Sequence, residues 1–163
     1  MSEKLVRLKS IKALPGSKLK LVWSSDGSTS CDLTGLIARS LALSALSDAR
    51  VFALAKVVDR GAAVRWPKNV DLSAQTLRQI SREQEVFDDK SFRAWQVELD
   101  LSNRESADAL GVTRGTIRNY RNGNGVPLAV AIACRAMMND PHVIAAHFKP
   151  RKPGRPFGSR NSD

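Results

Sequence analysis

The hydrophobic and polar positions of the N-terminal half alternate with a period of two, which is the pattern of half-buried β-strands. The clearest case is the segment KLKLVW, in which Leu19, Leu21 and Trp23 share one face. The segments LVRLKSIKA before it and STSCDL after it are the expected partner strands. Asp26 and Gly27 favour a tight hairpin turn between the second and third strands, because short hairpin turns need positive φ.

Helical periodicity interrupts these strands at two places. LSDARVFALAKV predicts a short helix that Ser47 caps, with Val51, Leu54 and Val57 on its inner face. AKVVDRGAAVRW predicts a second hairpin, which turns at its DRG sequence. DLSAQTLRQIS then predicts a helix that leaves the domain, and REQEVFDDK predicts the helix end and a polar linker. We therefore expect a small α+β domain over residues 1–80.

The hydrophobic period becomes helical in the second half, where SFRAWQVELD places Phe92, Trp95 and Leu99 on one face. We expect a helical domain of four or five helices over residues 81–148. The fold class is therefore α+β, with an antiparallel-sheet plus helix domain followed by an all-α domain. The last long helix begins near Pro127, and three of its residues are predicted to face inward: Leu128, Ile132 and Ala136.

Two short helices joined by a glycine turn are predicted in SNRESADALGVTRGTIRNYRNG. Ser102 and Glu105 match the S-x-x-E capping box, so the first helix begins at the residue after Ser102. Gly111 suits a left-handed residue at its end, and Thr113 caps a second helix that runs to about Arg121. Such a turn lets the second helix cross the first steeply and expose its N-terminal end to a groove.

The exposed positions of the second helix carry residue types that recognise bases. Arginine binds guanine O6 and N7 bidentately, and asparagine binds adenine in the same way. We therefore assign base contacts to Arg114, Arg118 and Asn119, and a close backbone approach to DNA at Gly115. Side-chain oxygens and helix N-terminal amides suit phosphates. The candidate phosphate contacts in this segment are Asn103, Thr113 and Arg121.

LSNRESADALGVTRGTIRNYRNG resembles the helix-turn-helix of the phage-repressor and Cro-like family, whose matching positions read L-S-x-x-E-x-A-x-x-L-G-V-S-x-x-T-I-x-x-Y-E-x-G. The resemblance implies that Arg114, Gly115 and Asn119 contact bases and that Asn103 and Thr113 contact phosphates. An ordinary helical hairpin with a solvated arginine face is the alternative.

The sequence departs from the family pattern at two positions. Ser106 stands where a leucine usually packs, which weakens the expected core, and Arg121 replaces a common glutamate. The second change adds positive charge at the end of the helix that would face DNA.

The first half resembles an uncharacterised bacterial domain family, on the segments KLVWSSDG, CDLTGLIA, ARVFALAKV and VRWPKNVDLSAQTL. The resemblance implies a fold but no established activity, so we expect this domain to dimerise or to bind a partner. Some members of the family lie beside toxin-like genes. An antitoxin-like protein that binds a toxin and represses their shared promoter is therefore an alternative function.

The chain is strongly basic, with 26 Lys and Arg against 16 Asp and Glu, a net charge of +10 and a pI near 10.2. This balance favours a polyanionic partner, because bound phosphates release condensed counterions.

Prolines in the tail, residues 149–163, favour an extended segment. Its PGRPFGSRN sequence resembles an AT-hook, which implies that Arg155 enters the minor groove. The expected flanking phosphate contacts are Arg151, Lys152 and Arg160.

No motif for a catalytic centre, a nucleotide site or a metal site is found in the sequence. Cys31 and Cys134 are expected to be buried thiols, and His142 and His147 lack metal-ligand spacing. We therefore expect no enzyme activity and no cofactor. We expect a cytoplasmic location, because the N-terminus lacks the apolar core of a signal peptide and no apolar run reaches the ~18 residues of a membrane span.

The combined expectation is a sequence-specific DNA-binding transcription regulator that acts as a homodimer on a palindromic site. A protein-interaction module that keeps the helix-turn-helix only as a scaffold is the remaining alternative.

Overall fold

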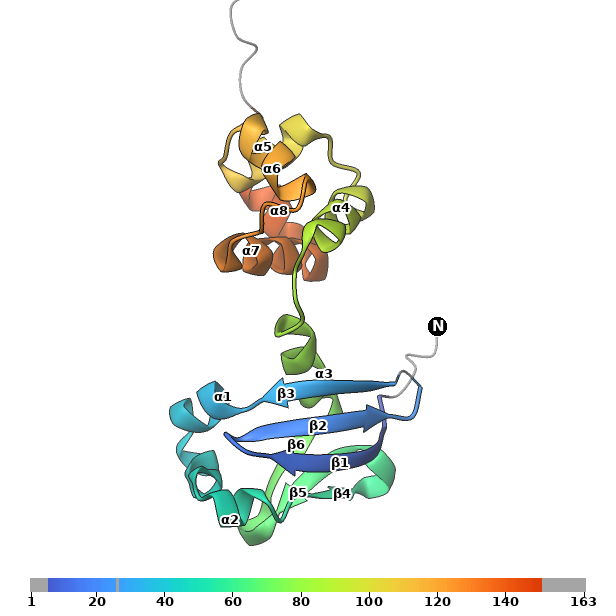
Figure 1. Ribbon diagram of the computed structural model, residues 1–163, viewed down its shortest axis with the longest axis vertical. Helices are drawn as coiled ribbons and strands as arrows, with labels where there is room; N and C mark the ends of the chain where they lie inside the picture. Colours follow the sequence, from blue (N-terminus) through green and yellow to red (C-terminus); the bar gives the residue numbers. More distant parts are fainter. Residues whose placement is uncertain (1–5, 26, 151–163) are drawn as a thin grey trace, which may run out of the picture. The chain divides into compact units, whose positions relative to one another are not determined.

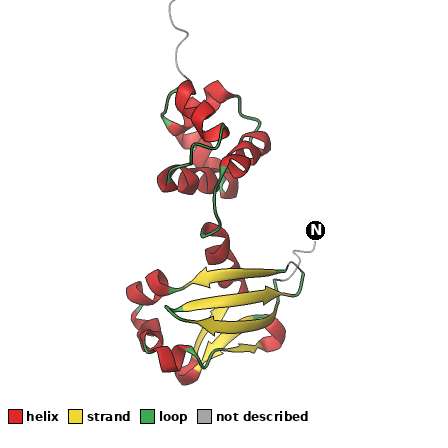
Figure 2. Cartoon of the chain, in the orientation of Figure 1, coloured by secondary structure: helices red, strands yellow, loops and turns green. Residues whose placement is uncertain are grey.

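The computed structural model describes residues 6–25 and 27–150. The chain divides into two compact units, Met1–Glu85 and Val86–Asp163, here called unit 1 and unit 2. The described strands all lie in unit 1, whereas unit 2 is helical (Figure 2). The fold class is α+β, as predicted. Within the described part of the chain, no helix has both the length and the apolar character needed to cross a membrane.

Unit 1 contains two three-stranded antiparallel sheets (Figure 1). The two predicted hairpins are confirmed, and Gly27 has a φ of +57° in the first of them. Asp26, its predicted partner in that turn, lies outside the described residues. The first sheet contains β1 (Leu8–Leu14), β2 (Lys18–Trp23) and β3 (Ser28–Asp32), and the second contains β4 (Lys56–Val58), β5 (Ala63–Trp66) and β6 (Val70–Ser73).

Strand β6 replaces the start of a predicted helix, because its residues pair with β5. The turn before β6 places Lys68 and Asn69 at positive φ without a glycine, so the sequence carried little signal for it. Helix α3 (Ala74–Glu83) therefore begins after Ser73, whose Oγ accepts a hydrogen bond from the Thr76 amide at 3.0 Å.

The helices of unit 1 are shorter than the periodicity predicted. Asp48, rather than Ser47, caps α2 (Ala49–Phe52), and its Oδ1 accepts a hydrogen bond from the Arg50 amide at 2.8 Å. Because α2 ends at Phe52, Leu54 leaves the inner face and is exposed, contrary to the prediction. The other helical segments of unit 1 are α1 (Thr34–Arg39) and the 3-10 turns at Leu41–Ser47, Asp59–Gly61 and Pro67–Asn69.

The core of unit 1 contains the inner residues of both sheets. Leu19 and Leu21 are fully buried there, together with Trp23 and Trp66. Trp66 Nε1 donates a hydrogen bond to the Phe52 carbonyl at 3.0 Å, so the polar atom of this buried ring has a partner. The predicted inner face of the KLKLVW strand is confirmed.

Five helices form the described part of unit 2, which agrees with the predicted number: α4 (Asp89–Glu98), α5 (Asn103–Leu110), α6 (Arg114–Arg121), α7 (Leu128–Asn139) and α8 (Pro141–His147). Their core includes Phe92, Trp95, Ile117 and Tyr120. Asp88, expected in a solvated linker, caps α4 by accepting a hydrogen bond from the Ser91 amide at 2.9 Å.

The inner face of α7 differs from the prediction. Leu128 is 72% exposed and Ile132 is 53% exposed, whereas Ala131, Cys134 and Met137 are buried. Helix α7 is apolar at nearly every position, so hydrophobic periodicity alone did not identify the side that packs on the core.

Both cysteines are buried and free, as predicted. Burial raises the pKa of Cys31 to about 11 and that of Cys134 to about 12. The thiols therefore stay protonated at neutral pH, where a thiolate would be the reactive form.

Candidate nucleic-acid interface

Helix α5 begins with the predicted capping box. Ser102 Oγ accepts a hydrogen bond from the Glu105 amide at 3.2 Å, and Glu105 Oε2 accepts one from the Ser102 amide at 2.9 Å. Hydrogen bonds from the Ser102 side chain and from its backbone amide to the Glu105 carboxyl lower the pKa of that carboxyl. Local sequence thus determines where α5 starts.

A left-handed glycine separates α5 from α6. Gly111 has a φ of +67°, and the Val112 amide donates to the Ala107 carbonyl at 3.0 Å. Thr113 then caps α6, because its Oγ1 accepts a hydrogen bond from the Thr116 amide at 3.1 Å. The turn, the cap and both helix bounds agree with the prediction.

The four predicted base-contacting residues lie on the exposed part of α6. Arg114, Gly115, Arg118 and Asn119 are all exposed, whereas Ile117 is fully buried on the opposite side. In the described part of the chain, neither Arg114 nor Arg118 has an ion-pair partner. The two guanidinium groups are therefore available to an external acceptor.

Packing within the fold does not require a glycine at position 115. A Cβ added there would meet only Thr113 Oγ1, at 3.6 Å, which is ordinary van der Waals contact. Gly61 shows the opposite case, since a Cβ there would lie 2.3 Å from the Leu8 carbonyl oxygen. Glycine costs ~1 kcal/mol relative to alanine in a helix interior, and packing gives no reason for it at position 115, the second residue of α6.

A buried glutamine holds α6 in place. Gln96, on α4, is 3% exposed, and its Nε2 donates to Ser106 Oγ at 2.7 Å and to Asn103 Oδ1 at 3.2 Å. Its Oε1 accepts a hydrogen bond from Arg121 Nη1 at 2.6 Å. One side-chain amide therefore links α4 to both α5 and α6.

The two departures from the repressor-like pattern meet at this amide. Ser106 is fully buried, and besides its bond to Gln96 its hydroxyl donates to the Ser102 carbonyl at 2.8 Å. The serine that replaces the usual leucine thus has hydrogen-bond partners for its buried hydroxyl. The sequence analysis missed Gln96, although it lies four residues after Phe92 and shares that inner face, where a polar residue needs polar partners.

Arg121 has a different environment from the predicted one. It is half-buried, its guanidinium binds Gln96, and its carbonyl accepts a hydrogen bond from Arg93 Nε at 3.1 Å. The sequence predicted a charge on the DNA-facing surface, whereas these contacts give Arg121 a positioning role within unit 2. Asn103 likewise uses its Oδ1 on Gln96.

The remaining predicted contacts are in the tail. Arg151, Lys152, Arg155 and Arg160 lie outside the described residues.

His142 is bound to Asp140, with 2.9 Å between Nδ1 and Oδ1. Among the described residues, no cluster of three or more His, Cys, Asp and Glu side chains could hold a metal ion.

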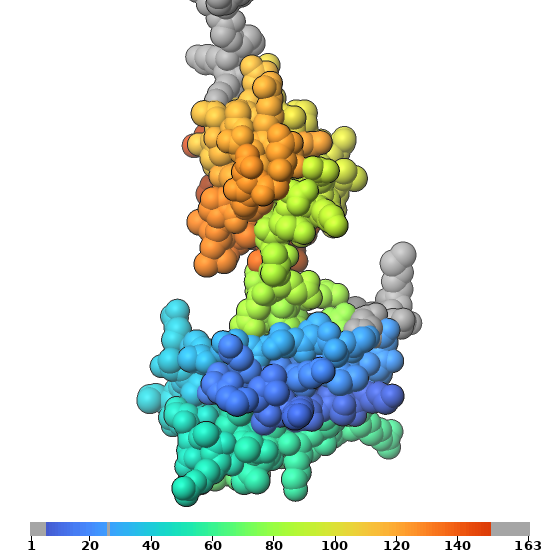
Figure 3. Space-filling model, viewed as in Figure 1, coloured from blue at the N-terminus to red at the C-terminus, as the bar shows by residue number. Residues whose placement is uncertain are grey.

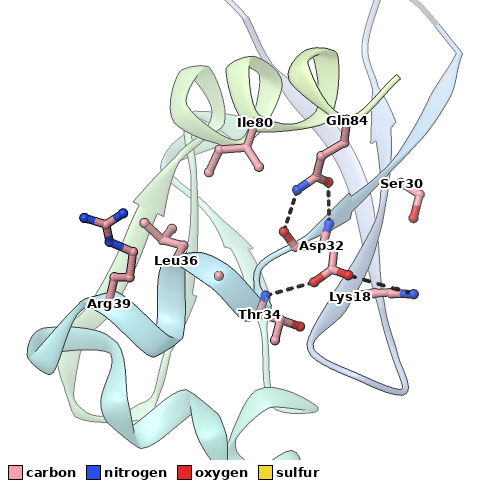
Figure 4. Close-up of a pocket in the computed structure, with 9 residues that line it drawn as sticks. Lys18, Ser30, Asp32, Thr34, Leu36, Arg39, Ile80 and Gln84 are labelled. Atoms are coloured by element: carbon pink, nitrogen blue, oxygen red, sulfur yellow. Dashed lines mark hydrogen bonds and ion pairs between the residues drawn. The ribbon is translucent and has the colours of Figure 1, made fainter. Parts of the chain in front are cut away.

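A hollow of about 780 Å³ on unit 1 is the other candidate site. Figure 4 shows Asp32 at its centre, with Lys18, Thr34 and Gln84 around it. The Asp32 carboxylate accepts a hydrogen bond from the Thr34 amide at 2.9 Å and lies 3.9 Å from Lys18 Nζ. Hydrogen bonds from Thr34 lower the pKa of Asp32, so the carboxylate is ionised and already has partners at neutral pH.

Gln84 lines this hollow and binds the backbone of Asp32. Its side-chain amide accepts a hydrogen bond from the Asp32 amide and donates one to the Asp32 carbonyl, both at 2.8 Å. Two such bonds imitate a neighbouring strand and cover the free edge of β3. The polar groups at the centre of the hollow therefore stabilise the fold, and α6 is the stronger candidate site.

Comparison with known proteins gives little further information. No family model matches the chain, and no curated protein does. Among solved structures, the chain is similar to a candidate DNA-binding protein from Nitrosomonas europaea, with 22% identity and a TM-score of 0.46. That match covers 81% of this chain and 86% of the other.

Substitution of Gln96 tests whether the buried amide positions α6. In Gln96→Ala, Ser106 and Arg121 lose a buried partner, which should lower the free energy of unfolding of unit 2 by about 2 kcal/mol. Native-state hydrogen exchange of the α6 amides measures this change. Glu98→Ala, an exposed change on the same helix, should leave exchange unaltered. Equal protection in both variants would show that the amide does not hold α6.

Proposed function

We propose that the protein is a sequence-specific DNA-binding protein and a transcription regulator, with α6 in the major groove. One observation carries the proposal: α6 exposes two arginines without ion-pair partners, an asparagine and an unexplained glycine. A solvated face would need neither the glycine nor these hydrogen-bonding types together. No catalytic activity forms part of the proposal.

The spacing of the arginines suggests how α6 recognises DNA. Arg114 and Arg118 are one helical turn apart, about 5–6 Å, and thus project from the same side. Successive bases of one strand are about 3.4 Å apart, so the two side chains reach guanines at adjacent or next-adjacent positions. Asn119 lies beside Arg118 and suits an adenine. The preferred half-site therefore contains guanine within a few base pairs of adenine.

Phosphate contacts would set the register of α6 on the duplex. The N-terminal amides of α5 and α6 favour anions through the helix dipole. Thr113 is exposed at the start of α6, and Asn103 is partly exposed at the start of α5. The tail arginines and Lys152 would add contacts on either side, with Arg155 in the minor groove.

Replacement of a base-contacting arginine tests the proposal. Arg114→Ala should cost about 1–3 kcal/mol on the preferred site and leave binding to unrelated DNA nearly unchanged, because a bidentate guanine contact is lost. Fluorescence anisotropy on the gene's own upstream duplex and on a shuffled duplex, at near-physiological salt, measures both affinities. Arg50→Ala, an exposed arginine of unit 1, is the matched control. Equal losses on the two duplexes would remove Arg114 from base recognition.

Gly115 provides a second test with opposite signs for stability and binding. Gly115→Ala should stabilise unit 2 by about 1 kcal/mol, because alanine favours the helix and meets no close atom. The same methyl group should weaken binding to the preferred duplex by about tenfold or more, if the backbone approaches the DNA there. Thermal unfolding and anisotropy on the same preparations measure the two effects. A stabilised variant with unchanged affinity would contradict the close approach.

The proposal also includes a homodimer, since one helix-turn-helix covers only a half-site. The supporting observation is α7, where Leu128, Ala129 and Ile132 form an exposed stripe without charge. A helix that is apolar on all sides is normally buried. A second copy suits the stripe, because a two-fold contact places the same apolar patch on both sides.

Charges placed in the α7 stripe test the dimer. Leu128→Glu with Ile132→Glu should raise the dimer dissociation constant by about tenfold or more, because the interface would bury unpaired carboxylates. Sedimentation equilibrium measures the constant. Leu41→Glu, at a leucine of unit 1 that is 94% exposed, is the control and should behave as the unmodified protein does. A dimer of undiminished stability in the double variant would exclude this stripe as the interface.

A further inference from the structure

Unit 1 carries more of the positive charge than the unit that contains α6. Residues 1–85 have 14 basic and 8 acidic side chains, a net charge of +6, whereas residues 86–163 have 12 and 8, a net charge of +4. A domain used only for protein contacts has no need of this excess. The location of the charge on unit 1 is therefore informative.

The outer face of the first sheet gathers exposed lysines. Leu19 and Leu21 point into the core, so Lys18 and Lys20 of β2 point outward. Lys12 of β1 lies directly opposite Lys20 in the antiparallel register. Directly opposite residues have Cβ atoms about 5 Å apart, and alternate residues of one strand are about 7 Å apart. Three ammonium groups thus originate from one small area.

An irregularity in β1 places Lys12 on this face. The register shifts between Leu8 and Ser10, which puts Leu8 on the inner face and Ser10 on the outer one. Lys9, at the shift, is also exposed. Two residues of β1 span one step of β2 at this shift. With regular alternation from the buried Leu8, Lys12 would point toward the core instead.

The described acidic residues of unit 1 pair with Lys18 but not with Lys12 or Lys20. Asp32 is the one described carboxylate on the outer face, and it lies opposite Lys18. Asp59 and Asp71 both bind Arg65 instead, at 3.4 and 3.3 Å. Within the described residues, Lys12 and Lys20 have no ion-pair partner. Like charges directly opposite each other destabilise a sheet, so an external anion would stabilise this pair.

The face is open, and apart from Asp32 its other side chains are uncharged. Figures 1 and 3 show the blue strands β1 to β3 as a surface that no described helix of unit 1 covers. Its remaining outward positions follow from the register: Ser10, Leu14, Val22, Ser28 and Ser30. The three serine hydroxyls of this face can donate to phosphate oxygens.

We propose that this lysine face binds the phosphate backbone of double-stranded DNA without regard to sequence. Lysine is a point charge that suits phosphates, whereas protein interfaces are depleted of lysine and enriched in aromatic side chains. Single-stranded nucleic acid usually stacks its bases on aromatic rings, and the described positions of this face carry none. The inference goes beyond the proposed function, because it does not require α6 to recognise bases.

Salt dependence isolates the lysine face in the full-length protein. Each phosphate contact contributes about 0.9 to the slope of log affinity against log salt, so Lys12→Gln with Lys20→Gln should reduce the slope on a random duplex by about two units. Fluorescence anisotropy over a salt series measures it. Lys56→Gln with Lys68→Gln, two exposed lysines elsewhere on unit 1, is the matched control and should leave the slope unchanged.

The thermal unfolding temperature of the double variant checks that the fold survives. It should equal or exceed that of the unmodified protein, because the variant removes a repulsive pair. An intact variant with an unchanged salt slope, or a control that loses as much as the test variant, would overturn the assignment to DNA. The second result would mean that only the net charge of unit 1 matters.

The two proposals fail separately in this design. Equal affinity for the native and shuffled duplexes, with a reduced slope in the lysine variant, would refute sequence recognition by α6 and support the lysine face. A preserved preference for the native duplex, with an unchanged slope, would refute the lysine face alone.

Discussion

The hydrogen-bonded amide of Gln96 is the constraint on which the candidate interface depends. It is buried among apolar side chains, where an unsatisfied amide would cost about 1–3 kcal/mol. Its bonds to Ser106 and Arg121 require α5 and α6 to pack on α4 in one arrangement. Because hydrogen bonds are directional and apolar contacts are not, this network specifies the direction in which α6 presents Arg114 and Arg118.

The proposals assign different tasks to arginine and lysine. Arginine has a rigid planar group that distinguishes guanine, and two exposed arginines lie on α6, the helix that we propose enters the major groove. Lysine carries a compact charge without directional preference, and Lys12 and Lys20 lie on an exposed sheet face where a phosphate backbone could contact both. Unit 1 would then supply only contacts that position the protein, whereas the contacts that select a sequence would come from unit 2.

Much of the fold could be predicted because its signals are local. Alternation predicted β2, and the capping box, Gly111 and Thr113 predicted both bounds of α5 and the start of α6. The failures have equally physical causes. Strand β6 follows a turn without glycine, α2 ends before its periodicity does, and α7 is too uniformly apolar for Leu128 and Ile132 to reveal which side is buried.

Local sequence was enough to predict strand β2, helices α5 and α6 and the residue types exposed on α6, because caps, turns and periodicity involve neighbours within about four residues. Only the tertiary structure decided the roles of Gln96 and Arg121, which lie 25 residues apart and meet through packing of α4 and α6. The same holds for Lys12 and Lys20, whose opposition depends on strand register. Contacts between distant residues depend on how whole elements pack, and that information is spread over the chain rather than carried by any one segment.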